Sequence, residues 1–393
     1  MKKVILSMLA VSAMVFTSCS DDNNDPGPTK QEVVAPATYD FSDVKGNSNV
    51  SFSGQVARLK MINELKSVLG KNTKTEAQLV EMFTNGTGFP DELGVNDSGK
   101  KLRETVAAAT NSNTSSVEED ALRVKIDGWL KDHATTLYAN WDKDASAGIA
   151  GKVVTGSRTA YVNAKGVEYN QAFAKTLIGS VIVDQVVNKY VSQKYLEDNK
   201  AGHEAGTPYK NDDTKNYTAL QHGWDEAYGY VFGLETDTKS PSREGGSLLN
   251  KYLKKVEGGK KFKGIFDEVY NAFKLGRAAI DAKDYELVNK QAEIIRTEIS
   301  KVVGVMAVYY LQKGKGTRDA NKLHSLSEGY GFVKSLRFVH INGKQVEENQ
   351  IKASIEALEA DNGLWSVTDD KLQEIADRLA RYFGFTAADA LSL

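Results

Sequence analysis

The sequence is poor in cysteine and proline and carries no surplus of either charge. It contains 1 cysteine among 393 residues, so no disulfide can form within the chain. Its 6 prolines leave long stretches in which helices can run without interruption. The 50 basic and 52 acidic residues give a formal charge of -2, which argues against nucleic acid as a partner. The composition therefore predicts a globular protein whose core needs no disulfide.

Long apolar runs are also scarce, and the one that stands out lies near the N-terminus. Lysines at positions 2 and 3 precede a mainly apolar, uncharged run at 4–16, and Thr17 and Ser18 lead to the single cysteine, Cys19. The run is shorter than the ~20 residues of a membrane-spanning helix, and the layout is typical of a secretory signal. We expect residues 1–19 to be a lipoprotein signal peptide with Cys19 as the lipidation site. The alternative is a plain secretory signal that contains an incidental cysteine.

Residues 20–38 are acidic, rich in Asn and Pro, and poor in large apolar side chains. This composition favours a disordered tether. The acidic run after Cys19 resembles the surface-export signals of Bacteroidetes-type lipoproteins. We expect a cell-envelope protein that is lipid-anchored to the outer membrane and surface-exposed; a position on the periplasmic face is the alternative. The lipid anchor is then the predicted membrane contact, since no second apolar run approaches spanning length.

Apolar residues at helical spacing dominate the rest of the chain. In residues 54–69, for example, Val56, Leu59 and Ile62 share one stripe. The same spacing predicts helices over residues 116–137, 169–190, 262–282, 285–311, 319–338, 347–358 and 369–383.

One segment breaks the helical pattern. Residues 152–162 are β-branched on both sides of a Gly-Ser pair, which predicts a short hairpin. Polar loops are expected at 199–216 and 236–246, where they could border a cleft. The predicted fold class is all-α, with two packed helical-bundle lobes at 39–150 and 151–393, an internally duplicated helix pair, and this hairpin.

A repeated motif is the most informative feature. Residues 222–234 read HGWDEAYGYVFGL and residues 324–336 read HSLSEGYGFVKSL. In both copies a His is followed by Glu at i+4 and by Gly at i+7, and on a helix these three residues lie on one face. The glycines, Gly229 and Gly331, are expected where each helix approaches another backbone closely. If the copies form one site, their two helices must approach each other.

The paired residues are His222 with Glu226 and His324 with Glu328. Two such pairs facing each other would supply two imidazoles and two carboxylates, which suit a transition metal such as iron or zinc. Asp225 is a possible additional ligand. The alternative is a pair of buried His-Glu hydrogen bonds that hold helices in register.

The repeat extends to the preceding helices, because residues 170–182 and 290–303 also look alike. The repeat unit is therefore predicted to be a helix pair.

Other enzyme signals are mostly absent. His203 begins a string like HExxH, but position 207 is Thr, so we expect it to lie in a polar surface loop. Arg277 and Asp281 are four residues apart, which favours a helix ion pair over a catalytic role.

The motifs HGWDEAYGY and HSLSEGYGF, together with GRAAI and SFSGQVARL, resemble an uncharacterised family of Bacteroidetes lipoproteins. That family is in turn distantly similar to imelysin-like proteins, which are helical lipoproteins of two bundle-like halves, named for a peptidase activity and linked to iron uptake. Their hallmark is GxHxxE. Here no glycine lies two residues before His222, and position i+3 is Asp225 in one copy and Ser327 in the other. The resemblance therefore implies a role only for the four paired His and Glu residues and Asp225.

Three functions fit these observations. The first is a tethered protein that binds a metal or a metal-bearing ligand through the His-Glu pairs. The second is a metallopeptidase-like hydrolase in which a metal activates water and a Glu acts as base. The third is a non-catalytic interaction module whose His-Glu pairs serve the fold alone. Binding is favoured over catalysis, and the geometry of the two pairs separates the three.

Overall fold

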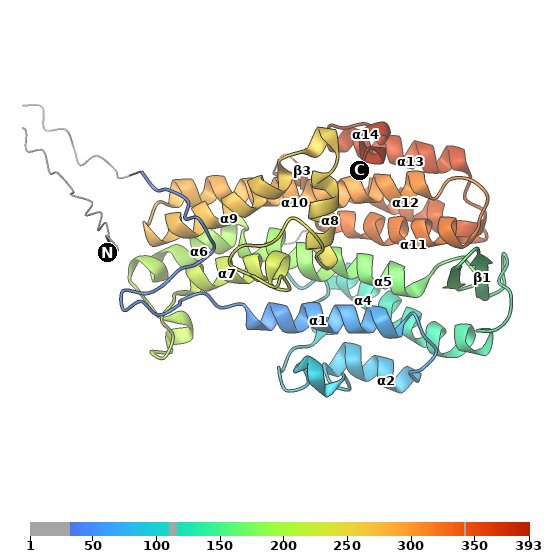
Figure 1. Ribbon diagram of the computed structural model, residues 1–393, viewed down its shortest axis with the longest axis horizontal. Helices are drawn as coiled ribbons and strands as arrows, with labels where there is room; N and C mark the ends of the chain where they lie inside the picture. The colour runs from blue at the N-terminus through green and yellow to red at the C-terminus, as the bar shows by residue number, and fades with distance from the viewer. Residues whose placement is uncertain (1–31, 110–115, 342) are drawn as a thin grey trace, which may run out of the picture. The chain divides into compact units, whose positions relative to one another are not determined.

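Helices form most of the molecule, and the predicted mostly α-helical fold is confirmed (Figure 1). The computed structural model describes residues 32–109, 116–341 and 343–393. Residues 33–393 cluster into one compact unit. The α-helices are α1 (Ser53–Val68), α2 (Glu76–Val80), α3 (Leu102–Thr105), α4 (Ser116–Asp132), α5 (Tyr169–Leu177), α6 (Gln193–Glu204), α7 (Ala219–Phe232), α8 (Leu248–Glu257), α9 (Ile265–Asp281), α10 (Tyr285–Lys313), α11 (Ala320–Ser335), α12 (Glu348–Glu359), α13 (Asp369–Tyr382) and α14 (Ala387–Leu391).

The predicted hairpin is present. Strand β1 (Gly151–Thr155) pairs antiparallel with β2 (Arg158–Val162), and Gly156 turns the chain with a φ of +59°. A second pair, β3 (His340–Ile341) with β4 (Lys344–Gln345), was not predicted. Strands of two residues are too short to show an alternating pattern.

Helices α6 and α8 lie where the sequence analysis predicted none, as do the short helices α2, α3 and α14. The loop expected at 199–216 begins too early, because α6 continues to Glu204. Its N-terminus is capped by Ser192, whose hydroxyl accepts a hydrogen bond from the Tyr195 N–H. Helix α8 was also not predicted, although its apolar residues Leu249, Leu253 and Val256 are buried. Both segments are rich in Lys, Asn and Glu, which obscures their apolar stripe.

The centre of the unit is the helix predicted over residues 169–190. It begins as α5 and continues through two π-helical segments, η4 (Ile178–Val183) and η5 (Val186–Tyr190). Figure 1 shows α5 between α1 and α11, and both helices pack against it. Helix α7 packs against η5, α1, α6 and α9, while the long α10 packs against α9, α11 and α13. The two motif helices, α7 and α11, therefore contact different halves of one central helix.

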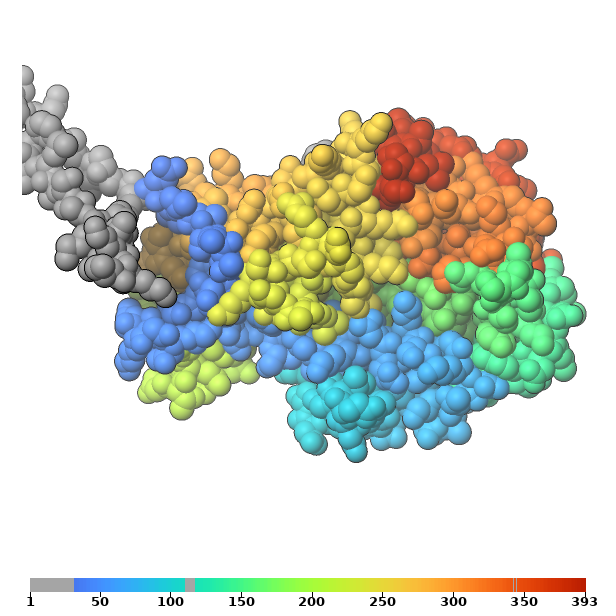
Figure 2. Space-filling view, viewed as in Figure 1, coloured from blue at the N-terminus to red at the C-terminus, as the bar shows by residue number. Residues whose placement is uncertain are grey.

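The segment before α1, residues 37–52, lies across α7 and α9. The Tyr39 N–H donates to the Lys239 carbonyl at 2.8 Å, and Lys274 Nζ donates to the Ala37 carbonyl at 3.1 Å. The Tyr39 ring stacks on Tyr228 of α7 with centroids 3.6 Å apart. Figure 2 shows the segment in blue on the outside of the molecule. None of the helices in the described ranges has the length and apolarity of a membrane span.

Candidate functional site

The first His-Glu pair lies on α7, which begins with a capping box between Thr218 and Gln221. His222 Nε2 and Glu226 Oε1 are 3.7 Å apart, as expected one turn apart on the same face. The third partner comes from α1, where Gln55 Nε2 donates to Glu226 Oε1 at 2.7 Å. The Glu226 carboxylate thus contacts an imidazole and a neutral amide.

Two tyrosines from the preceding loop enclose the imidazole of His222. The Tyr217 ring stacks on it with centroids 4.9 Å apart, and the Tyr209 ring lies 4.3 Å away at a tilt. Burial lowers the pKa of His222 below its usual value, although the nearby Glu226 charge acts in the opposite direction. The ring is therefore the neutral imidazole at neutral pH, which is the form that binds metals.

A cavity of about 510 Å³ opens in front of this pair. Lys100, Lys210 and Lys215 line it, with Asp212 as a further acidic side chain. Both Lys210 and Lys215 are close enough for their charges to contribute to the low pKa of His222. We call this cavity the α7 cavity. Its other lining residues are Ser51, Ser53, Gly54, Gln55, Ala57, Gly94, Ser98, Tyr209, Tyr217, His222 and Glu226.

The second pair, on α11, has more partners. His324 Nδ1 donates to Glu168 Oε2 at 2.6 Å, while His324 Nε2 lies 3.7 Å from Glu328 Oε2. Lys175 Nζ of α5 forms an ion pair with Glu328 Oε1 at 2.7 Å, and the Tyr252 hydroxyl donates to the same oxygen at 3.3 Å. Glu328 is thus directly paired with a buried lysine, whereas no described lysine or arginine forms an ion pair with Glu226.

These contacts change the pKa values of Glu328 and Lys175. Burial by itself would raise the pKa of Glu328, but the charges of Lys175 and His324, together with hydrogen bonds from Lys175 and Tyr310, lower that pKa below the ordinary value. Burial lowers the pKa of Lys175 to about 8, even with Glu328 beside it. The second pair thus belongs to a compensated, buried ion-pair network, which is what a structural role requires.

The two motif helices do not meet through their glycines, and that part of the prediction is wrong. A Cβ placed on Gly229 would lie 2.4 Å from the Cβ of Phe52, just before α1. A Cβ on Gly331 would lie 2.6 Å from the Cβ of Lys175 on α5. Each glycine does allow a close approach, but to a different element. At its glycine, α7 approaches the start of α1, and at the matching glycine α11 approaches α5.

Among the described residues, no group of three or more His, Cys, Asp or Glu side chains is placed to hold a metal ion. His222 and Glu226 are therefore separate from His324 and Glu328 rather than parts of one four-ligand centre. Each pair supplies one imidazole and one carboxylate.

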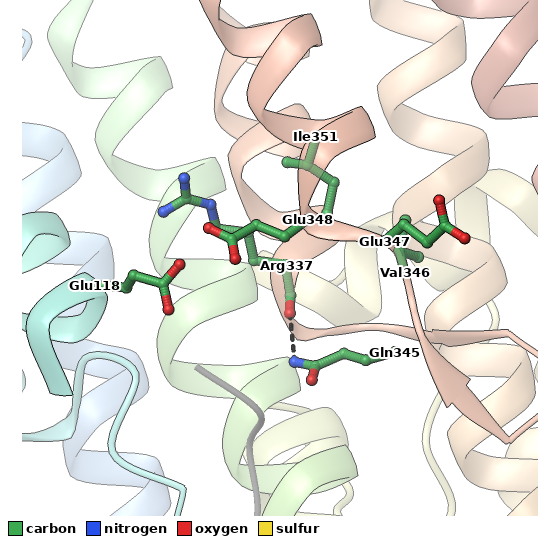
Figure 3. Close-up of a pocket in the computed structure, with 7 residues that line it drawn as sticks. All are labelled: Glu118, Arg337, Gln345, Val346, Glu347, Glu348 and Ile351. Atoms are coloured by element: carbon green, nitrogen blue, oxygen red, sulfur yellow. Dashed lines mark hydrogen bonds between the residues drawn. The ribbon is translucent and has the colours of Figure 1, made fainter. Parts of the chain in front are cut away.

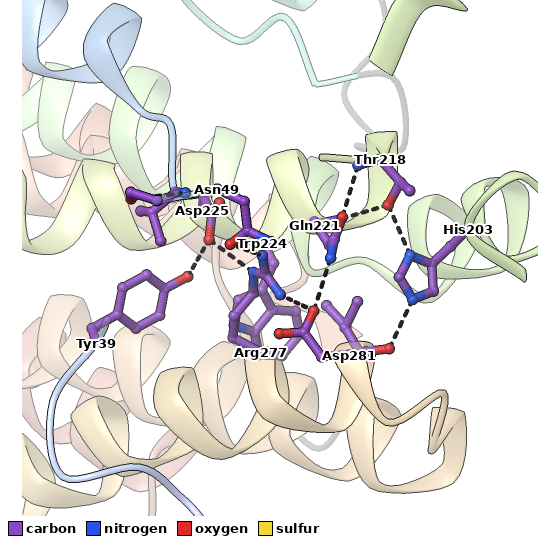
Figure 4. A network of polar contacts seen from close by, with 12 residues as sticks. Tyr39, Asn49, His203, Thr218, Gln221, Trp224, Asp225, Arg277 and Asp281 are labelled. Atoms are coloured by element: carbon purple, nitrogen blue, oxygen red, sulfur yellow. Dashed lines mark hydrogen bonds and ion pairs between the residues drawn. The ribbon is translucent and has the colours of Figure 1, made fainter. Parts of the chain in front are cut away.

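Asp225 belongs to a buried network instead of the α7 cavity (Figure 4). Its Oδ1 accepts hydrogen bonds from the Tyr39 hydroxyl at 2.6 Å and from Arg277 Nε at 3.2 Å. Asp225 and Arg277 are both fully buried, and Arg277 also pairs with Asp281, as the spacing on α9 predicts. Burial raises the pKa of Asp225 to about 6, although Arg277 opposes this. The network ties residues 39–51 to α7 and α9.

His203 is in the same region, and its expected place in a surface loop is wrong. It lies near the end of α6 and is 6% exposed. Its Nε2 donates to the Ile280 carbonyl at 2.8 Å, so its Nδ1 accepts from the Thr218 hydroxyl at 2.8 Å. The imidazole joins α6, α7 and α9, and this structural role replaces the metal role that HExxH would imply.

The sequence did not reveal the partners from other helices, namely Gln55, Glu168 and Lys175. Each lies more than 150 positions from its motif residue. A polar residue on an otherwise apolar helix face was the available signal. Lys175 shows it best, since it interrupts the apolar stripe of α5.

A further cavity of about 260 Å³ lies between the starts of α4 and α12, away from every predicted site residue. Figure 3 shows the carboxylates of Glu118 and Glu348 facing each other there, beside Arg337. A hydrogen bond with Glu118 raises the pKa of Glu348, with burial as the next cause.

A comparison with known families identifies the chain. The model of a domain of unknown function, DUF4856, matches residues 36–386. The chain belongs to the DUF4856 family. The resemblance to an uncharacterised family is thereby confirmed. No curated protein and no solved structure matches this DUF4856 protein. Cys19, the predicted lipidation site, lies outside the described residues.

Proposed function

We propose that this DUF4856 protein is a lipid-anchored binding protein of the cell envelope, of imelysin-like type. It takes a small anionic ligand that carries a metal ion into the α7 cavity. His222 and Glu226 are the residues that contact the metal of this ligand. The protein performs no covalent chemistry on it.

The observation that carries this proposal is the difference between the two copies of the motif. Glu328 is paired with Lys175, so its charge is already neutralised within the fold. Within the described residues, Glu226 forms no ion pair with a lysine or arginine. It contacts His222 and the neutral amide of Gln55, and it lines a cavity of about 510 Å³. Lys189 acts on Glu226 through its charge but forms no ion pair with it. A carboxylate without a directly paired lysine or arginine, next to an open cavity, is suited to a positively charged ligand atom.

The number of metal-binding residues in the α7 cavity indicates that the metal would arrive with a chelator. An imidazole nitrogen and a carboxylate oxygen suit iron or zinc, but two protein donors leave most of a coordination sphere to be filled. Catalytic zinc sites use three protein ligands, and the described residues offer no third donor here. This favours binding over metallopeptidase-like hydrolysis. The missing donors would come from a chelating ligand.

The lysines of the α7 cavity indicate the charge of the chelator that would hold the metal. Lys100, Lys210 and Lys215 line the cavity against a single further acid, Asp212. Their positive charges complement the negative charge of a chelator, such as one with several carboxylates. The lysines and the His-Glu pair thus recognise different parts of one molecule.

The proposed location of the protein rests on its N-terminal sequence. In this proposal Cys19 carries the lipid, and residues 20–38 separate it from the described unit. Surface exposure on the outer membrane is favoured by the acidic residues after Cys19. The periplasmic face is the alternative position.

Calorimetric titration of the mature protein tests the binding proposal. The ligands are iron(III) citrate, citrate alone, and zinc chloride alone. We expect iron(III) citrate to bind best, and Glu226→Gln to weaken it at least tenfold, since a hydrogen bond or ligand bond to a charged group is worth about 1.5–3 kcal/mol.

The second motif provides the matched control, because Glu328→Gln changes the same residue type at the same motif position. That variant should keep full affinity, with circular dichroism confirming that it is folded. Equal binding by the wild type and Glu226→Gln, or equal losses in both variants, would overturn the proposal.

A further inference from the structure

A third cavity, smaller than the two described above, lies between α1, α5 and the start of α8. Its volume is about 160 Å³, below the roughly 300–1,000 Å³ of pockets for drug-sized ligands. Asn63 and Lys66 of α1, Lys175 of α5, and Lys251 of α8 contribute to its wall. We call it the lysine pocket. In Figure 2 the yellow loop that leads into α8 lies against the blue of α1.

The charges in the lysine pocket are not balanced. Of the three ammonium groups, only Lys175 has a carboxylate partner, Glu328 at 2.7 Å. Within the described parts of the chain, the ammonium groups of Lys66 and Lys251 have no hydrogen-bond or ion-pair partner. Burial and the like charge of Lys251 lower the pKa of Lys66, although the negative charges of Glu328 and Glu168 oppose this. Glu328 offsets one of these three positive charges by a direct ion pair, and an added anion would stabilise the other two.

Polar groups from the backbone and side chains complete the wall. Asn63 Nδ2 donates to the Ser247 hydroxyl oxygen at 2.6 Å, which fixes the loop before α8 against α1. Ser247 is the N-cap of α8 but does not cap it with its side chain. The partial positive charge of that helix end therefore adds to the field of the lysines.

We propose that the lysine pocket binds an oxyanion of phosphate size, either free phosphate or the phosphate group of a small ester. Lys66 and Lys251 contact its oxygens, and Lys175 contributes charge while it stays paired with Glu328. This site is separate from the α7 cavity, so it does not depend on the proposed function. A compact tetrahedral anion fits both the small volume and the threefold positive wall.

The test uses the mature protein and two probes, inorganic phosphate and glycerol 3-phosphate. Binding is measured by calorimetry, and thermal unfolding is compared with sodium chloride at equal ionic strength, because salt screens charges generally. We expect both probes to raise the Tm of the wild type. Tighter binding of one probe than of the other identifies the source of the phosphate group.

Two variants and one control locate the site. Lys66→Gln and Lys251→Gln should each weaken binding about tenfold, which corresponds to about 1.4 kcal/mol. Lys290→Gln removes one charge from an exposed position on α10 and should bind normally. Lys251 is exposed, so its variant keeps the test valid even if Lys66→Gln fails to fold. Absence of binding to the wild type, or equal binding by all three variants, would overturn the proposal.

Discussion

Replacing Arg277 with methionine should destabilise the protein strongly. Arg277 is fully buried and donates through Nε to Asp225, which is also fully buried. It also donates through Nη2 to Asn49 Oδ1 at 3.1 Å. Removing one partner of a buried ion pair costs about 3–5 kcal/mol, because the other charge stays in a poorly solvated position. That is a large part of the roughly 5–15 kcal/mol by which proteins are stable.

The loss should depend on Asp225. Without Arg277, its carboxylate keeps the Tyr39 hydroxyl and the Ser51 N–H, 3.4 Å from its Oδ2, but has no cation. Asp225→Asn in the Arg277→Met background removes the unpaired charge, so the double variant should be more stable than Arg277→Met alone. The pKa of Asp225, already about 6, should rise further in the single variant. A raised acid pKa means that the folded state holds the proton more tightly, so stability falls as pH rises from 3.8 through that pKa.

Urea unfolding at pH 5.5 and pH 8 measures these effects. The deficit of Arg277→Met should be larger at pH 8. Arg158→Met, at an exposed position on β2, is the control and should stay within about 0.5 kcal/mol of the wild type. A deficit below about 1 kcal/mol for Arg277→Met, or no recovery in the double variant, would refute this account.

Three further predictions are simpler to test. Cys19→Ser should abolish acyl labelling and release the protein from membranes in fractionation, whereas unchanged retention would contradict lipidation. Gly331→Ala should lower the urea midpoint because its Cβ would overlap Lys175, while Gly202→Ala, with open space around it, should be neutral or stabilising by up to about 1 kcal/mol. Burial lowers the pKa of His133 to about 4, so stability should be full above pH 6.5 and fall by up to about 3 kcal/mol towards pH 4; His133→Gln should lose that dependence.

The helices were predictable because their apolar stripes are local. The helix over 169–190 and the hairpin near 152–162 appear where the spacing places them. Helix α6 was missed because its polar composition outweighed two buried positions, Leu196 and His203. A stripe that narrow is hard to distinguish from a loop by composition alone.

The candidate site shows a different limit. The spacing of His222 and Glu226 placed both on one helix face, and they do lie 3.7 Å apart. Their environment depends on Gln55 of α1, and that of Glu328 depends on Lys175 of α5. These contacts join distant parts of the chain, so no local pattern distinguishes the neutral partner from the charged one. Two copies that look alike in sequence thus differ in electrostatics.

The segment at residues 37–52 also determines how the molecule responds to mechanical load. If Cys19 is anchored in a membrane, any pull on the tether enters the fold at this segment. Its bonds to Lys239, Lys274 and Asp225 reach two helices, so tension is shared among them and does not peel off one end of the chain. The same segment leads directly into α1, whose Gln55 holds Glu226. Tension that passes these bonds would therefore reach the wall of the α7 cavity next.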